Sequence, residues 1–155
     1  MFANHDDIQA CLEVLQKGGI ILYPTDTVWG IGCDATNEAA VKRIFELKKR
    51  ADSKAMIILV HDEQLILNYV EINELQVFDY IKGIHKPTTV IYQNAKNLAN
   101  NLMSDDGSVA IRVCKDQFCK ELIHQYGKPI VSTSANISSY PTALCFNDIS
   151  MEIVE

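Results

Sequence analysis

The sequence lacks the segments and motifs that mark several common protein classes. No apolar run approaches the roughly 20 residues that cross a bilayer, and residues 1–7 lack a signal-peptide pattern. There is no Walker loop, and Gly30-Ile31-Gly32 lacks the third glycine of a dinucleotide-binding fingerprint. We therefore expect a cytoplasmic protein that does not contact a membrane and that carries none of the standard nucleotide-binding signatures.

Cysteine and histidine are few and scattered. The five cysteines form no C-x-x-C pair and the four histidines form no ligand set. We therefore expect free thiols in a reducing compartment and no metal held by the protein. No G-x-S-x-G turn surrounds Ser134, and no histidine is paired locally with a candidate nucleophile. These absences argue against covalent catalysis.

Length and patterning indicate one α/β domain over residues 1–155. The composition, 48% hydrophobic and 22% charged, is ordinary for a soluble globular protein. Helices and strands alternate along the chain without repeats or linkers, which is typical of an α/β fold. Residues 147–155 give no convincing helix or strand. The expected helices begin at Asp6 or Asp7 and at Thr36 or Asn37 and run over 65–84 and 116–126; the expected strands are 20–23, 55–60, 88–92, 109–113 and 130–133.

Hydroxyl and amide side chains gather where two of the expected strands end. Ser132 to Asn136 bring three hydroxyls and a carboxamide to the end of the strand at 130–133. A similar polar segment, Thr25-Asp26-Thr27, follows the strand at 20–23. Because α/β folds bind ligands at strand ends, these two segments predict a site for a small polar anion.

Positive charge is concentrated in one segment of an acidic chain. The net charge is −6, yet residues 42–54 carry six Lys and Arg against Glu46 and Asp52. This cluster fits either an anion site or a helix end whose cations offset the macrodipole. Arg112 lies within an expected strand, where it fits either a buried salt bridge or an anchor for a carboxylate or phosphate.

Five segments together resemble a known family. They are PTDTVWGIG at 24–32, KKR at 48–50, KPTT at 86–89, SVAIR at 108–112 and STSANIS at 132–138. In this order they are similar to the signatures of the YrdC-type threonylcarbamoyl-adenylate synthases, over about residues 15–145. The resemblance implies a single-domain twisted mixed sheet flanked by helices, with a concave, positively charged cavity. It also implies a chain that lacks the family's usual C-terminal segment.

The resemblance further implies an activity and a set of binding residues. The reaction joins L-threonine, bicarbonate and ATP into threonylcarbamoyl-AMP and pyrophosphate, for N6-threonylcarbamoylation of tRNA by downstream transferase machinery. Mg²⁺ would enter bound to ATP, and catalysis would rest on positioning and charge stabilisation without a protein nucleophile. By motif position, Thr27, Arg112 and Ser132 would bind threonine, and Lys48, Arg50, Lys54, Ser108, Ser134, Asn136 and Thr142 would bind ATP.

Two alternative functions are also compatible with the sequence. One is a non-catalytic module of the same fold that binds tRNA or double-stranded RNA. The net charge of −6 and the absence of aromatic-rich RNA-binding segments argue against it. The other is a related enzyme that adenylates a different carbamoyl donor, and the same motifs would persist there. Release of pyrophosphate from ATP, with threonine and bicarbonate omitted in turn, distinguishes the three.

Overall fold

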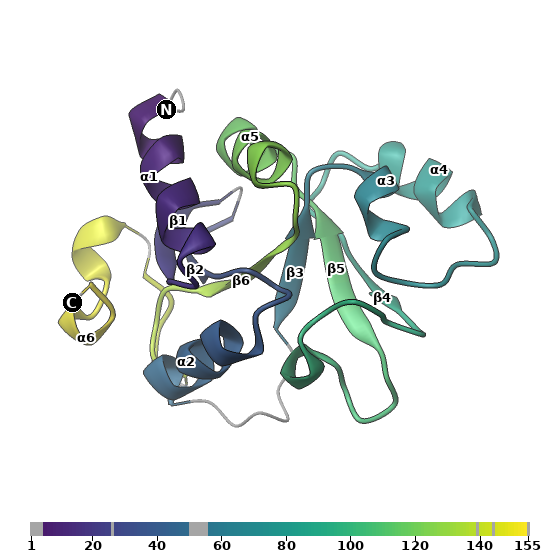
Figure 1. Ribbon diagram of the computed structural model, residues 1–155. Coiled ribbons are helices and arrows are strands. Elements are labelled where there is room, and N and C mark those ends of the chain that lie inside the picture. The colour runs from purple at the N-terminus through teal and green to yellow at the C-terminus, as the bar shows by residue number, and fades with distance from the viewer. Residues whose placement is uncertain (1–4, 26, 50–55, 139, 144, 155) are drawn as a thin grey trace.

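The structure is a computed structural model that describes residues 5–25, 27–49, 56–138, 140–143 and 145–154. Its centre is one six-stranded mixed sheet in the order β1-β2-β6-β3-β5-β4 (Figure 1). Only β3 and β5 pair in parallel, and the other neighbours are antiparallel. The predicted fold class is confirmed. The strands are β1 Ile21–Pro24, β2 Trp29–Gly32, β3 Ile57–Val60, β4 Thr89–Tyr92, β5 Val109–Val113 and β6 Ile130–Ser134.

Helices cover both faces of the sheet. On one face α1 packs against α5, and on the other α2 packs against the short 3₁₀ helix η1, while α3 contacts β3 (Figure 1). The buried aliphatic side chains of these helices and of the strands form one core. The helices are α1 His5–Gln16, α2 Glu38–Lys48, α3 Glu63–Ile66, α4 Gln76–Lys82, α5 Gln117–Tyr126 and α6 Met151–Val154, with 3₁₀ helices η1 Asn100–Leu102 and η2 Phe146–Asp148.

Side-chain caps fix two helices where the sequence predicts them. The Asn37 side chain accepts a hydrogen bond from the Ala40 amide at 3.0 Å and so begins α2. Asp116 does the same for the Cys119 amide at 2.9 Å in α5. Gly127, with φ of 77°, ends α5 in the left-handed conformation that glycine adopts without strain. These caps set the direction in which the chain enters and leaves the sheet.

The structure corrects four of the sequence predictions. Strand β2 was not expected, and the segment 65–84 forms the two short helices α3 and α4 instead of one long helix. Asp6 and Asp7 lie in the first turn of α1 rather than before it. Residues 147–155 were expected to have no regular structure, yet they include α6 and part of η2. In the break between α3 and α4, Val70 forms a bridge with Ala95, so sheet-like pairing replaces helix there.

One face of the sheet is only partly covered. Paired residues of neighbouring strands share a face, so the register places Ser132, Ile57 and Ala110 side by side. Arg112, two residues further along β5, lies on the same face. Tyr23 also lies on this face and is fully buried, whereas Ile57 and Arg112 are only half-buried. The face is therefore open at its β3–β5 end.

A buried carboxylate ties the end of α5 to the segment before α2. Asp34 is 5% exposed and accepts hydrogen bonds from the Thr36 amide at 2.7 Å, the Thr36 hydroxyl at 2.6 Å and the Tyr126 hydroxyl at 2.6 Å. Burial by itself would raise the pKa of Asp34, but these hydrogen bonds, with the ammonium of Lys128 at 3.5 Å, outweigh it and lower the pKa. The ionised form is thus the one that the fold stabilises.

We expect Asp34→Asn to lower the free energy of unfolding by about 2 kcal/mol at pH 7, the scale of hydrogen bonds to a charged group. A lowered carboxyl pKa contributes stability above the unfolded-state pKa, and that contribution is lost as pH falls through the folded-state pKa. The gap between wild type and variant should therefore begin to narrow below about pH 4 and close as pH falls through the lowered folded-state pKa of Asp34. Urea unfolding at several pH values measures it. A gap that is constant down to pH 3 would contradict the assignment.

Candidate functional site

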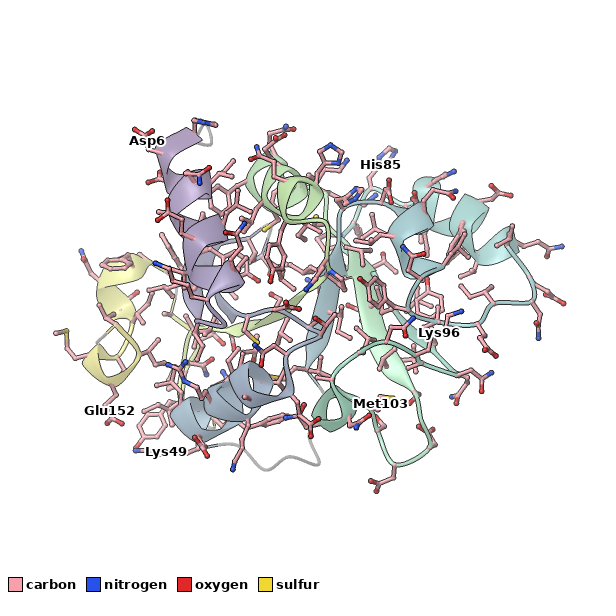
Figure 2. All side chains as sticks on the ribbon, viewed as in Figure 1. Asp6, Lys49, His85, Lys96, Met103 and Glu152 are labelled. Atoms are coloured by element: carbon pink, nitrogen blue, oxygen red, sulfur yellow. The ribbon has the colours of Figure 1, made fainter. Side chains whose placement is uncertain are left out.

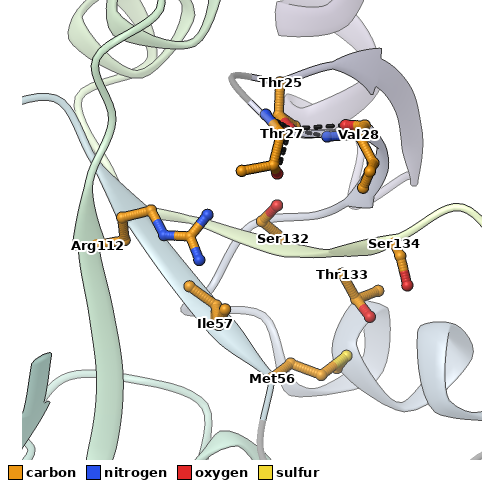
Figure 3. Close-up of a pocket in the computed structure, with 10 residues that line it drawn as sticks. Thr25, Thr27, Val28, Met56, Ile57, Arg112, Ser132, Thr133 and Ser134 are labelled. Carbon is orange, nitrogen blue, oxygen red and sulfur yellow. Dashed lines mark hydrogen bonds between the residues drawn. The ribbon is translucent and has the colours of Figure 1, made fainter. Parts of the chain in front are cut away.

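A cavity of about 290 Å³ opens at the uncovered end of the sheet (Figure 3). Four of the residues predicted to bind substrates line it: Thr27 from the β1–β2 turn, Arg112 from β5, and Ser132 and Ser134 from β6. Its volume lies at the small end of the range for ligand pockets. The fold therefore brings together side chains that lie more than one hundred residues apart in sequence. The lining is Thr25, Thr27, Val28, Gly30, Met56, Ile57, Arg112, Ser132, Thr133 and Ser134.

The hydroxyl of Thr25 organises the turn that carries Thr27. It donates to the Val28 carbonyl at 2.6 Å and accepts from the amides of Thr27 at 3.1 Å and Val28 at 3.2 Å. The hydroxyls of Thr25 and Thr27 lie 3.1 Å apart (Figure 3). A threonine that bonds its own turn in this way replaces the missing ladder contacts of the backbone. Thr27 is thereby held at the rim of the cavity.

Arg112 extends from β5 toward Ser132 across the cavity floor (Figure 3). Its Nε donates a hydrogen bond to the hydroxyl of Thr89 on the neighbouring strand β4, at 3.1 Å. A planar guanidinium offers five N–H donors in a fixed arrangement, which matches the two oxygens of a carboxylate. The position of Arg112 in a cavity lined with hydroxyls is what the ligand-anchor hypothesis requires.

Lys48 holds the turn formed by Ser134, Ala135 and Asn136. Its ammonium donates to the carbonyl oxygens of Ser134 and Asn136, both at 2.6 Å, and lies 3.4 Å from the Asn136 side-chain oxygen. The residue is 2% exposed. Sequence reasoning assigned Lys48 to ATP, and that role stays a prediction. The structure adds a second role, because the ammonium fixes the turn from beneath.

Further hydrogen bonds make this turn rigid. The Ala135 amide donates to the Trp29 carbonyl at 2.9 Å, and the Ser138 amide donates to the Lys48 carbonyl at 3.0 Å. The Ser134 hydroxyl is bonded to the Asn136 side-chain oxygen. The Asn136 side-chain nitrogen donates to the Tyr140 carbonyl at 2.7 Å. Ser134 therefore reaches the first cavity with its position set by neighbours on both sides.

A fully buried tyrosine supports the other side of the site. The Tyr23 hydroxyl donates to the Val131 carbonyl at 3.3 Å, next to Ser132. Burial, and then the nearby Cys119, raise the pKa of Tyr23 well above its ordinary value. The phenol is thus neutral at physiological pH and serves as a fixed hydrogen-bond donor under β6.

A second cavity of about 470 Å³ borders the Ser134–Asn136 turn, and Ala135, Asn136 and Thr142 are among its lining residues. An ion pair between Lys49 and Glu152, 3.1 Å apart, stands at its edge (Figure 2). Two of the predicted ATP residues, Asn136 and Thr142, thus share a cavity adjacent to the one that holds Arg112. The same turn borders both spaces.

Ser108, another residue predicted to bind ATP, is not among the described residues that line either cavity. Ser108 is buried just before β5 begins, four residues and about 13 Å along the strand from Arg112. Arg50 and Lys54 lie outside the described residues. Within the part of the chain that is described, no three His, Cys, Asp or Glu side chains gather as a metal-binding group. No helix among the described residues is both long and apolar enough to cross a membrane.

Sequence reasoning missed several residues of the first cavity. Thr25 and Thr133 were within the quoted motifs and could have been assigned from their hydroxyls. Met56 and Ile57 carry no chemical signal in the sequence, because their place in the lining follows from the pairing of β3 with β5 and β6. Gly30 matters through its size, since a Cβ there would lie 3.0 Å from the methyl group of Thr25.

Comparison with known proteins gives a consistent result. The Sua5/YciO/YrdC family model, which carries the description "Telomere recombination", matches residues 13–155. The chain is 31% identical over 153 residues to a threonylcarbamoyl-AMP synthase of Photobacterium profundum, covering 97% of this chain and 83% of that protein. It is also 31% identical over 156 residues to a threonylcarbamoyl-AMP synthase of Pseudoalteromonas translucida, covering 99% and 83%.

The fold also matches solved structures. The crystal structure of P. abyssi Sua5 complexed with L-threonine superimposes with a TM-score of 0.86 and 24% sequence identity. The match covers 97% of this chain and 47% of that one. It supports the sheet order and helix placement described above.

Proposed function

Because the chain belongs to the Sua5/YciO/YrdC family, we propose that it is a threonylcarbamoyl-AMP synthase that acts on L-threonine, bicarbonate and ATP. The observation that carries the proposal is the cavity that joins Thr27, Arg112 and Ser132 beside the Ser134–Asn136 turn. A carboxylate anchor with two hydroxyls suits an amino acid, and the adjacent cavity lined by Asn136 and Thr142 suits a nucleotide. The relatives named for this activity match nearly the whole chain.

In this proposal the first cavity holds threonine. The guanidinium of Arg112 binds the carboxylate through two parallel hydrogen bonds, and the hydroxyls of Thr27 and Ser132 bond the remaining polar groups. The threonine amine attacks the carbon of bicarbonate, a C–N bond forms, and water leaves to give a carbamate. A carbamate oxygen then attacks the α-phosphorus of ATP, the bond to the β-phosphate breaks, and pyrophosphate departs. No step requires a nucleophile from the protein.

The ATP contacts form the second part of the proposal. Ser134, Asn136 and Thr142 offer neutral donors and acceptors around the two cavities, and Arg50, Lys54 and Ser108 keep the roles that their motifs imply. Mg²⁺ enters with ATP and offsets charge on the phosphates, since this cation retains water and binds nucleotides through phosphate oxygens. The rate enhancement then comes from positioning and electrostatic stabilisation.

The product is a mixed anhydride whose threonylcarbamoyl group can be passed to an amine. We propose that tRNA adenosine is its destination and that a threonylcarbamoyl-transferase consumes it in the cytoplasm. The protein itself need not bind RNA for this sequence of reactions.

Pyrophosphate release tests the proposed function. It should appear only when ATP, threonine and bicarbonate are all present, because the last two assemble the attacking carbamate. Pyrophosphate release that does not depend on threonine would favour the alternative enzyme, which adenylates a different carbamoyl donor. Absence of release together with tight, salt-sensitive RNA binding would favour the RNA-binding module.

We expect Arg112→Lys to weaken the use of threonine roughly thirtyfold, about 2 kcal/mol, and to leave ATP affinity nearly unchanged. Lysine keeps the charge but lacks the planar arrangement of donors that forms two parallel hydrogen bonds with a carboxylate. Steady-state kinetics with each substrate varied in turn measures the effect. Equal losses for threonine and ATP would contradict the assignment of Arg112 to the amino acid.

A further inference from the structure

Thr89 contacts the carboxylate anchor from the edge of the sheet. In the antiparallel pair β4–β5, Thr89 stands directly opposite Arg112, so both side chains leave the same face of the sheet. The Arg112 Nε donates to the Thr89 hydroxyl at 3.1 Å. Thr89 is not among the described residues that line the first cavity, and it reaches the site through its hydrogen bond to Arg112.

The contact selects which edge of the guanidinium meets a ligand. A guanidinium can meet a carboxylate either through Nε and one terminal nitrogen or through its two terminal nitrogens. With Nε bonded to Thr89, the edge that carries the two terminal nitrogens is presented to the cavity, on the side of Ser132 (Figure 3). We infer that Thr89 is a positioning residue that orients Arg112 for end-on binding of the amino-acid carboxylate. This inference rests on the proposed function.

The residue type suits the role. Arginine has a long side chain with many rotamers, and a fixed contact restricts them before the ligand arrives. Threonine is stiff at χ1 because it branches at Cβ, so its hydroxyl has a defined position on a strand. The neighbouring Thr88 alternates to the opposite side of the chain, and its hydroxyl donates to the Lys86 carbonyl at 3.0 Å. Thr88 therefore provides a matched control with the same chemistry and no contact of this kind.

The experiment compares Thr89→Val, Thr89→Ser and Thr88→Val in the full chain with wild type. We expect Thr89→Val to raise the KM for threonine roughly fivefold, because Arg112 loses a fixed contact but keeps its charge and its terminal donors, with kcat and the KM for ATP within about twofold. Thr89→Ser keeps the hydroxyl and should restore most of the threonine affinity. Thr88→Val should match wild type. In the Arg112→Lys background, which lacks Nε–H, Thr89→Val should have no further effect.

Two results would overturn the inference while leaving the proposed function intact. One is a Thr89→Val enzyme with the wild-type KM for threonine. The other is an equal change in the KM for threonine and the KM for ATP, which would indicate a loss of strand packing rather than of the orientation of Arg112. If wild type itself shows no threonine-dependent pyrophosphate release, the proposed function fails and the inference fails with it. The wild-type measurement alone separates these cases.

Discussion

Lys48→Met is expected to lower the free energy of unfolding by about 2–5 kcal/mol, because two buried carbonyl oxygens each lose a hydrogen bond from a charged donor. Methionine keeps most of the length and an apolar stem but cannot donate to the carbonyls of Ser134 and Asn136, which in wild type receive hydrogen bonds at 2.6 Å. The residue is almost fully buried, so water does not replace the lost donor. Thermal unfolding should show a fall of roughly 10 °C for a chain of this size.

Lys49→Met is the matched control. The next lysine pairs with Glu152 at 3.1 Å, but the two side chains are 64% and 61% exposed. An ion pair of that kind contributes about 0–1 kcal/mol, so this variant should unfold close to wild type. A Lys48→Met protein that keeps its melting temperature and loses only ATP affinity would show instead that Lys48 acts directly on the nucleotide, as its motif suggests.

The two lysines show where sequence reasoning ends. Both stand in the KKR segment and carry the same charge, so composition cannot separate a turn-fixing cation from a surface one. The difference arises because α2 ends at Lys48 and the chain turns left-handed at Lys49, with φ of 54°. That geometry buries the first side chain beneath the turn of β6 and leaves the second in solvent. Burial of a charge depends on tertiary neighbours that no local pattern encodes.

The fold was predictable wherever local signals agree with tertiary packing. Asn37 and Asp116 cap their helices through contacts within a few residues, so the local pattern sufficed to predict where these helices begin. The prediction of one helix over 65–84 was wrong because the apolar spacing continues through the break between α3 and α4. In that break Val70 pairs with Ala95, far along the chain. Strand β2 was not predicted, for a different reason. Two of its four residues are glycine, which lowers strand propensity. The reason for these glycines, the close approach of neighbouring atoms, is seen only once the sheet is formed.

The sequence predicted side chains that line the site but not the residues that hold those side chains in place. Thr27, Arg112 and Ser132 were identified by motif, and the sheet register brings them to one cavity. Their supporting contacts come from residues that the motif reading did not assign: Thr25 fixes the turn of Thr27, and Thr89 bonds Arg112. For a reaction without a protein nucleophile, rate depends on how firmly such groups are held. Under the proposed function, Thr25 and Thr89 therefore contribute to catalysis through the residues that they position.

Gly32→Ala is expected to destabilise the protein by about 3 kcal/mol, at the upper end of overpacking effects. A Cβ at this position would lie 2.4 Å from the backbone carbonyl oxygen of Val131 and 2.8 Å from the ring of Tyr23. The carbonyl belongs to β6 and cannot move without disturbing Ser132, the next residue in the cavity. Even one methyl group must therefore push β2 away from β6, and we expect threonine use to fall together with stability.

Gly83→Ala provides the comparison. A Cβ there would meet only the Tyr80 carbonyl at 3.5 Å and the Asp79 carbonyl at 3.8 Å, and φ is −77°. Alanine should be neutral or slightly stabilising, by about 0.5 kcal/mol, because it restricts the unfolded chain. Chemical unfolding of both variants, with threonine-dependent pyrophosphate release measured on the same samples, checks the pair. If Gly32→Ala were as stable and active as Gly83→Ala, the close approach of β2 to β6 would not be what positions Ser132, and the two glycines of β2 would need another explanation.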